Sequence, residues 1–278
     1  MATVTGISTQ MTNSAGQWTF YKRLGKTVAR EKMEKRPNQQ RSRSQVEHTI
    51  RMNNLVAFWA HTKGCLRGSF VWKRQGLTDY NAFVSENFDR NRICLSRGMT
   101  KLGACVAGPY ILSRGNLEPI GVSLSAEGVL YTDIALGEGF EITPQTTVRD
   151  LSIAIVDHNP DLGFRFGDVI MIVAVKQKTE SSDGCPRMLF RSRVLHLDVY
   201  NTDPLSFAPD DPTALAVVNG YLGATAPIVG GRAWIHASRT KRGTDVSTQK
   251  LVLSGDPDAP YTTPEAREAA IASYRPKE

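Results

Sequence analysis

The sequence predicts an α+β protein in which a basic N-terminal hairpin and helices precede a β-sandwich-like or partly open barrel region that ends in a short helix. Apolar residues recur at helical spacing between residues 44 and 88, whereas from residue 102 onward short apolar or alternating runs are separated by Gly, Asn, Pro and Asp. The charge divides similarly, because residues 1–116 hold 19 Lys and Arg against 6 Asp and Glu, and residues 117–278 hold 15 against 21. We therefore expect an extended arm over 1–16, a basic hairpin and helical region over 17–116, and a β-rich domain with a C-terminal helix over 117–278.

An aromatic and basic hairpin is expected near the N-terminus. Residues 18–21, Trp-Thr-Phe-Tyr, alternate in character, a corner follows at residues 23–25, and residues 27–30 run back. Two strands alone are marginal in water. We therefore expect the hairpin to lie against a later part of the chain, another subunit or nucleic acid. The small polar residues 1–16 are expected to form an arm that orders only against a partner surface.

Helices are predicted after the hairpin. The first begins either at Pro37, which suits a first helical turn, or at the capping-box spacing of Ser44–Glu47. Its apolar face runs from Val46 to Trp59 and is expected to be core. Thr78 is a favourable cap for a second helix that extends through Phe88.

The remainder of the chain is predicted to be mostly strands. Residues 66–72 fit a helix or a strand equally well, and residues 263–274 form a closing helix because Pro264 and an Ala- and Glu-rich composition favour one. The loops 157–161 and 179–184 separate strands. The predicted strands are Ala107–Leu112, Ile120–Leu124, Val129–Ile134, Leu151–Val156, Val169–Val175, Arg187–Leu197, Thr213–Leu222, Ala233–Ser238 and Thr248–Leu253.

Several classes of function have little support in the sequence. The cysteines show no CxxC spacing and the five histidines are scattered singly, so no metal is expected. There is no phosphate-binding loop, dinucleotide fingerprint or GxSxG elbow, so we expect no cofactor and no catalytic residue, and an enzyme is the weakest class. Neither a secretory signal nor an apolar run of 18 residues occurs, which predicts no membrane span and a reducing cytoplasm as the site of synthesis. The cysteines expected to be reduced and mostly buried are Cys65, Cys94, Cys105 and Cys185.

A basic segment near the N-terminus is the candidate contact surface for a partner or a polyanion. Lys and Arg neutralise phosphates, and Trp18, Phe20 and Tyr21 are suited to stacking on unpaired bases. No helix-turn-helix, zinc-finger or RNA-recognition signature frames them, and a solvated surface or pairing with the acidic part of a neighbouring copy accounts for the same charges. The candidate contact residues are Trp18, Phe20, Lys22, Arg23, Lys26, Arg30, Lys32, Lys35, Arg36, Arg41 and Arg43.

Three parts of the chain carry a recognisable pattern. They are FYKRLGKTVAREK followed by RPNQQRSRSQ near the N-terminus, NPDLGFRFGDVIMIVAVKQ in the middle, and GGRAWIHASRTKRGTDVSTQKLVL towards the C-terminus. Together they resemble an uncharacterised family, a domain of unknown function, found in Bacteroidetes genomes and in their phages. Asn-Pro is usual in that family where this chain has Arg36-Pro37-Asn38. The resemblance implies a helical N-terminal part, a β-rich remainder and a connection with phages or mobile elements, and it implies no catalytic residue.

The sequence favours a non-enzymatic assembly subunit. An extended arm, an aromatic hairpin and opposite charges on the two parts are typical of a subunit that neighbouring copies complete, for example by strand addition and charge pairing. With the phage resemblance, this predicts a virion component of the neck, tail or head, assembled in the bacterial cytoplasm, that forms homo-oligomers through its arm and hairpin and contacts other virion proteins. The second hypothesis is a cytoplasmic nucleic-acid-binding protein that uses the basic N-terminal segment.

Overall fold

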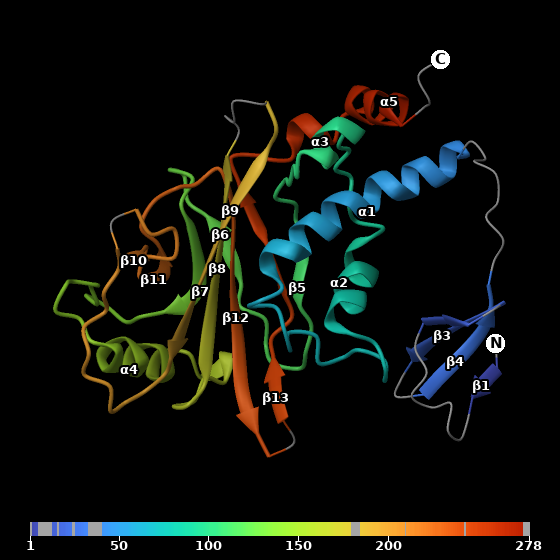
Figure 1. Ribbon diagram of the computed structural model, residues 1–278. Helices are drawn as coiled ribbons and strands as arrows, with labels where there is room; N and C mark the ends of the chain where they lie inside the picture. The colour runs from blue at the N-terminus through green and yellow to red at the C-terminus, as the bar shows by residue number, and fades with distance from the viewer. Residues whose placement is uncertain are drawn as a thin grey trace. The chain divides into compact units, whose positions relative to one another are not determined.

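The computed structural model describes residues 2–4, 13–15, 17–23, 26–32, 41–178, 184–208, 210–241 and 243–274, which form helices and antiparallel sheets (Figure 1). The chain divides into two compact units, Met1–Ser42 and Arg43–Glu278. The strand order of each sheet is open, so no sheet of the described residues closes into a barrel. The predicted α+β class is confirmed.

The described residues of the first unit form a four-stranded antiparallel sheet in the order β1-β4-β3-β2. Strands β3 (Trp18–Arg23) and β4 (Lys26–Glu31) form the predicted hairpin, and its corner at Leu24 and Gly25 lies outside the described residues. Strands β1 (Ala2–Val4) and β2 (Asn13–Ala15) pair with β4 and β3, respectively. The described part of the predicted arm therefore pairs with the hairpin of its own chain, which differs from the expectation of a free arm.

One face of the second unit is a layer of helices, comprising α1 (Arg43–Thr62), α2 (Asp79–Asn87), α3 (Arg97–Lys101) and α5 (Pro264–Ser273) (Figure 1). The side-chain oxygens of Thr78, Ser96 and Thr263 accept backbone N–H groups in the first turns of α2, α3 and α5, so each helix begins at a capping residue. The two helices predicted at 78–88 and 263–274 are confirmed. Helix α1 begins at the later of its two predicted positions, and Pro37 lies outside the described residues.

The middle layer of the second unit is a long antiparallel sheet in the order β13-β12-β8-β9, with β15 also paired to β12. Val173 and Ile235 belong to a core that includes residues of the helices, whereas Ile172 and Trp234 belong to a core on the opposite face. Because both faces of the sheet are covered, the first seven residues of β8, Val169–Val175, are a continuous apolar run. The strands are β8 (Val169–Lys178), β9 (Arg187–His196), β12 (Gly230–Thr240), β13 (Gly243–Val246) and β15 (Val252–Ser254).

A third layer covers the opposite face of this sheet (Figure 1). It consists of a second sheet in the order β10-β11-β7-β6 together with α4 (Val148–His158). A short 3₁₀ turn, Pro160–Leu162, follows α4, and another, Ala259–Tyr261, precedes α5. The strands of this layer are β6 (Val122–Leu124), β7 (Leu130–Ala135), β10 (Leu215–Val218) and β11 (Tyr221–Ala224).

The predicted strand at Leu151–Val156 is wrong, because these residues belong to helix α4. The hydroxyl of Thr147 accepts the N–H of Asp150, and the Asp150 carboxylate accepts the N–H of Thr147 in return. This capping box starts a helix whose buried side includes Ala154 and Ile155. The apolar run fits both the two-residue period of a strand and the 3.6-residue period of a helix, and the cap at Thr147 favours the helix.

The predicted boundary after residue 116 lies inside the second unit. Strand β5 (Ile111–Ser113) pairs with β14 (Gln249–Lys250), and Leu117 forms a further bridge with Ser247. Residues of α1, α2 and β8 also belong to one hydrophobic core. The helical and β-rich parts therefore share a core, and the observed division falls at Ser42 instead.

Some predicted strands shift or split in the structure. Only the end of the run at 107–112 is strand. The predicted strand 213–222 divides into β10 and β11, and the predicted strand 248–253 divides into β14 and β15. Residues 66–72 form turns apart from a bridge between Phe70 and Arg114. The strands predicted near 122, 130, 170, 190 and 235 are confirmed as β6, β7, β8, β9 and β12.

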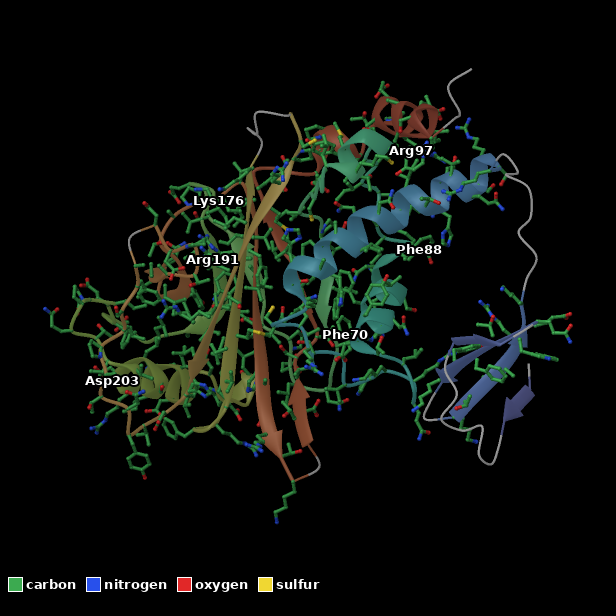
Figure 2. All side chains as sticks on the ribbon, viewed as in Figure 1. Phe70, Phe88, Arg97, Lys176, Arg191 and Asp203 are labelled. Carbon is green, nitrogen blue, oxygen red and sulfur yellow. The ribbon has the colours of Figure 1, made fainter. Side chains whose placement is uncertain are left out.

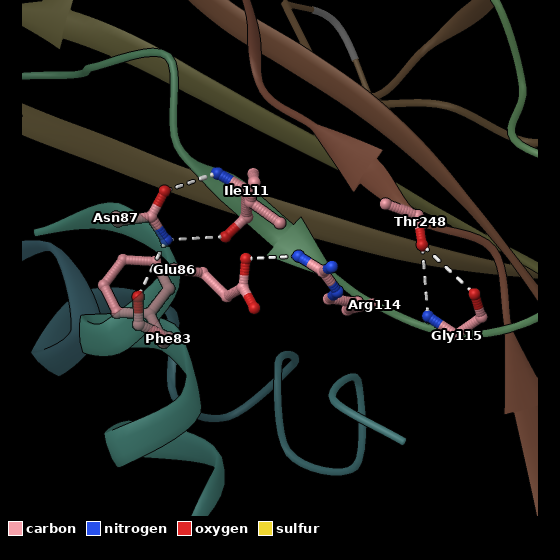
Figure 3. Close-up of polar contacts among 7 residues, drawn as sticks. All are labelled: Phe83, Glu86, Asn87, Ile111, Arg114, Gly115 and Thr248. Carbon is pink, nitrogen blue, oxygen red and sulfur yellow. Dashed lines mark hydrogen bonds and ion pairs between the residues drawn. The ribbon is translucent and has the colours of Figure 1, made fainter. Parts of the chain in front are cut away.

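Buried amide side chains replace backbone pairing where the chain is irregular. Asn87 of α2 donates to the C=O of Ile111 at 2.9 Å and accepts the N–H of the same residue at 2.7 Å (Figure 3). Asn54 of α1 pairs in the same way with Val106, at 2.9 Å for both bonds. Gln177 of β8 bonds to the backbone on either side of Val106. Asn54 and Gln177 satisfy backbone groups of a segment outside the strands, and Asn87 satisfies those on the side of Ile111 that does not face β14.

Candidate functional site: the N-terminal sheet

The register of the hairpin places the predicted contact residues on two faces of the N-terminal sheet. Trp18, Phe20 and Lys22 alternate along β3 and share one face. Lys26 and Arg30 of β4 lie on the other face, because residues opposite each other in the register share a face. The sequence analysis grouped these residues as one contact surface, whereas the sheet separates them into an aromatic face, with Trp18 and Phe20, and a basic face, with Lys26 and Arg30.

The aromatic face is incompletely covered. Trp18 is 43% exposed, and Phe20, two residues along the same strand, is half-buried. Ala29, opposite Phe20 in the register, is buried in the interior strand β4. An indole left this exposed next to apolar neighbours is typical of a surface that another chain covers.

The basic face holds its cations against an aromatic ring. The Arg30 guanidinium carbon lies 5.8 Å from the centroid of the half-buried Tyr21 ring, which is within the range of a cation–π contact. Lys26 is exposed on the same face, and Lys32 is exposed just after β4, where its backbone N–H donates to the C=O of Gln17. An arginine held in this way is suited to pairing with phosphate or carboxylate oxygens.

The remaining predicted residues do not all join this site. Lys35 and Arg36 lie outside the described residues, and Arg23 is described only through its backbone, which pairs with Lys26. Arg41 is exposed shortly before α1. Arg43 belongs to the second unit, where it forms ion pairs with Glu47 at 3.2 Å and Glu268 at 2.5 Å.

The structure also brings together a His and an Asp that sequence spacing did not connect. His236 Nε2 of β12 lies 2.9 Å from Asp168 Oδ2, although the two residues are 68 positions apart, and the side chains are only 1% and 5% exposed. Asp168 also accepts the N–H of Arg165, and the His236 ring packs 4.5 Å from that of Phe164. Burial this deep indicates a structural pair. The signal in the sequence is the position of His236 directly after the apolar residues Ala233–Ile235 of β12.

Arg232 lies two register positions before Trp234 on the same face of β12 and is also buried. Its guanidinium donates to the C=O of Pro212 at 3.1 Å and of Ala226 at 2.9 Å. Burial lowers the pKa of Arg232 to about 10, so the group is charged at neutral pH. Its bonds to backbone oxygens join β12 to two loops, and we assign it a structural role.

The described residues contain no metal site and no helix suited to a membrane. No three His, Cys, Asp or Glu side chains among them are grouped so that they could hold a metal ion. None of the described helices has both the length and the apolar character needed to cross a bilayer. Comparison with protein-family models, curated proteins and solved structures finds no match for this chain.

Proposed function

We propose that this chain is a non-enzymatic assembly subunit of a phage virion that oligomerises through its N-terminal sheet. The observation that carries the proposal is the aromatic face of that sheet, on which Trp18 is 43% exposed in a unit separate from the rest of the chain. The resemblance to proteins of Bacteroidetes phages supports a place in a virion neck, tail or head, with other virion proteins as further partners.

The small size of the N-terminal sheet supports burial against a partner. Its outer strands β1 and β2 contain three residues each, and the described residues of this unit include no helix to cover either face. A sheet of this kind gains stability when its apolar face packs against another surface. Exposed Trp residues that become buried at interfaces commonly contribute 2 kcal/mol or more to binding, which is roughly a 30-fold effect on the dissociation constant.

A second candidate function, nucleic-acid binding, is favoured by the basic face. Lys26 and Arg30 are exposed there, and Arg30 stacks on Tyr21. Contacts of this type follow the phosphate backbone and weaken steeply with salt because counterions are released. The aromatic and basic faces therefore predict different partners and different salt dependence.

Light scattering on the full chain, combined with the absorbance ratio for nucleic acid at low and high salt, tests both functions. We expect a discrete oligomer that persists at high salt and is free of nucleic acid. Trp18→Ala should raise the protein concentration needed to form this oligomer by roughly 30-fold. The matched control is Val194→Ala, since Val194 is 51% exposed and lies on β9 of the second unit.

Substitutions on the basic face separate the two candidates. Lys26→Glu with Arg30→Glu should leave the oligomer largely intact if assembly uses the aromatic face. A monomer that carries nucleic acid at low salt, and loses it both at high salt and in this double variant, would instead establish the nucleic-acid function. A wild-type monomer free of nucleic acid at all concentrations would contradict both.

A further inference from the structure

An exposed apolar loop joins α1 to α2 on the second unit. We name residues 67–77 the Trp72 loop. Val71 is 36% exposed, Trp72 61% and Leu77 38%. Three large apolar side chains so close in sequence form a patch of the kind that marks a binding surface.

The Trp72 loop is held in place by its own contacts. Phe70 is buried and anchors the loop, and the N–H of Val71 donates to the C=O of Arg114 at 2.9 Å. Lys73 forms an ion pair with Asp79 at 2.9 Å, and the other oxygen of Asp79 accepts the N–H of Gly68 at 2.9 Å. Because the loop is already ordered, binding through Trp72 loses little conformational entropy.

The surroundings of the Trp72 loop are basic. Arg67, Lys73 and Arg74 lie within the loop and are exposed. Residues 43–116, which include α1, α2 and α3, hold 11 Lys and Arg against 4 Asp and Glu. The excess of positive charge in this segment favours a partner that presents acidic side chains around an apolar contact.

The opposite face of the same unit has the complementary charge. The segments 135–165 and 197–205 hold seven Asp and Glu against two Arg. Hydrogen bonds gather them around α4. The N–H of Val148 donates to the C=O of Asp203, and the side-chain amide of Asn159 donates to the C=O of Ala135 and accepts its N–H. The exposed acidic residues Glu138 and Asp157 lie in these segments. We name this surface the α4 face.

The central sheet lies between the two surfaces. The core on one side of it includes residues of α1 and α2, and the core on the other side includes residues of α4. Figure 2 shows Phe70, at the base of the loop, and Asp203, beside α4, on opposite sides of the central strands. A contact between such surfaces on two copies joins different faces and repeats in one direction, so it forms a ring or a linear array.

We propose that the Trp72 loop of one copy docks on the α4 face of the next copy, forming a head-to-tail interface. The inference rests on the proposed function, because it assumes that the chain assembles, and it adds a second interface to that of the N-terminal sheet. Trp72, Val71 and Leu77 supply the apolar contact. Arg67 and Arg74 pair with acidic residues of the α4 face.

Two variants of the full chain test this interface by light scattering. The loop variant carries Arg67→Glu, Trp72→Ala and Arg74→Glu, and the α4-face variant carries Glu138→Lys and Asp157→Lys. Each alone should require at least roughly 30-fold more protein to reach the wild-type mass. Circular dichroism confirms that each variant is folded.

Mixing provides the decisive observation. The loop variant retains an intact α4 face, and the α4-face variant retains an intact loop, so one loop–α4-face contact can form between a copy of each. Both variants also keep the N-terminal sheet, so an equimolar mixture should have a higher mass than either variant alone at the same concentration and a lower mass than wild type. The matched control is Lys176→Glu with Arg191→Glu, which changes two exposed basic residues of β8 and β9 that belong to neither surface. This control should keep the wild-type mass.

The outcomes separate this inference from the proposed function. If the loop variant has the wild-type mass, the head-to-tail interface is overturned. The proposed function still stands in that case if the wild-type chain is an oligomer and Trp18→Ala weakens it. A wild-type chain that is monomeric throughout overturns both. Loss of bound nucleic acid from the loop variant, with its mass unchanged, would assign the loop to nucleic acid and overturn the inference.

Discussion

Replacing Asn87 by Ala tests how the second unit holds its irregular segments. The side chain is fully buried and donates to the C=O of Phe83 and of Ile111 at 2.9 Å, while its Oδ1 accepts the N–H of Ile111 at 2.7 Å (Figure 3). The Phe83 carbonyl keeps its position in the helical ladder, so the loss falls mainly on the two backbone groups of Ile111. A buried polar group left unpaired costs about 1–3 kcal/mol, so Asn87→Ala should lower the free energy of unfolding by about 2–4 kcal/mol.

Urea unfolding followed by circular dichroism, with hydrogen exchange at the Ile111 amide, measures this effect. The midpoint should fall without a change in the slope, and the Ile111 amide should exchange faster. Asn81→Ala is the matched control, because Asn81 lies in the same helix and is exposed, and its effect should stay within about 0.5 kcal/mol. An Asn87→Ala protein as stable as this control would refute the assignment of the amide as a substitute for strand pairing.

Three other substitutions or reagents test buried groups of the second unit. His236→Ala leaves the buried Asp168 carboxylate without its ring partner and should cost about 3–5 kcal/mol in urea unfolding; a cost below about 1 kcal/mol would contradict the pairing. Burial raises the pKa of Asp211, but its hydrogen bonds to Thr213 and its ion pair outweigh this and hold the pKa below 3.8. The stability that this ionised carboxylate contributes is present above about pH 4 and is lost as the pH falls through the folded-state pKa. When unfolding is measured from pH 6 to pH 2, the free energy of unfolding should therefore fall less in Asp211→Asn than in wild type. Burial raises the pKa of Cys105 to about 12, so at pH 8 a thiol reagent should label it only after denaturation, and rapid labelling of the folded protein would disprove this.

Local signals in the sequence predicted much of the fold. Thr78 makes the expected cap of α2, and α5 begins at Pro264 as predicted, with the hydroxyl of Thr263 as its cap. The apolar run Val169–Val175 predicted a strand, and it forms the first seven residues of β8. These features succeed because a cap or a long apolar run depends mainly on neighbouring residues.

The helix at residues 151–156 was missed although its signal is local, because these residues satisfy both a strand and a helix pattern and the capping box at Thr147 decides between them. Features that depend on distant partners could not be predicted. The pairing of His236 with Asp168 joins β12 to the residue just before β8, and the position of His236 in β12 does not indicate which residue is its partner. The candidate contact residues were predicted as a single set because their division between two faces requires the register of the hairpin.

The irregular segment at Cys105–Ala107 has a consequence for the order of folding. Its backbone bonds to Asn54, 52 residues from Val106, and to Gln177, 72 residues from Cys105. Neither amide reaches these groups until α1 and β8 have formed and docked, so the segment becomes ordered after the helical layer and the central sheet have met. We therefore expect this segment to order late in folding, so that substitutions of Asn54 or Gln177 should accelerate unfolding and leave the refolding rate nearly unchanged.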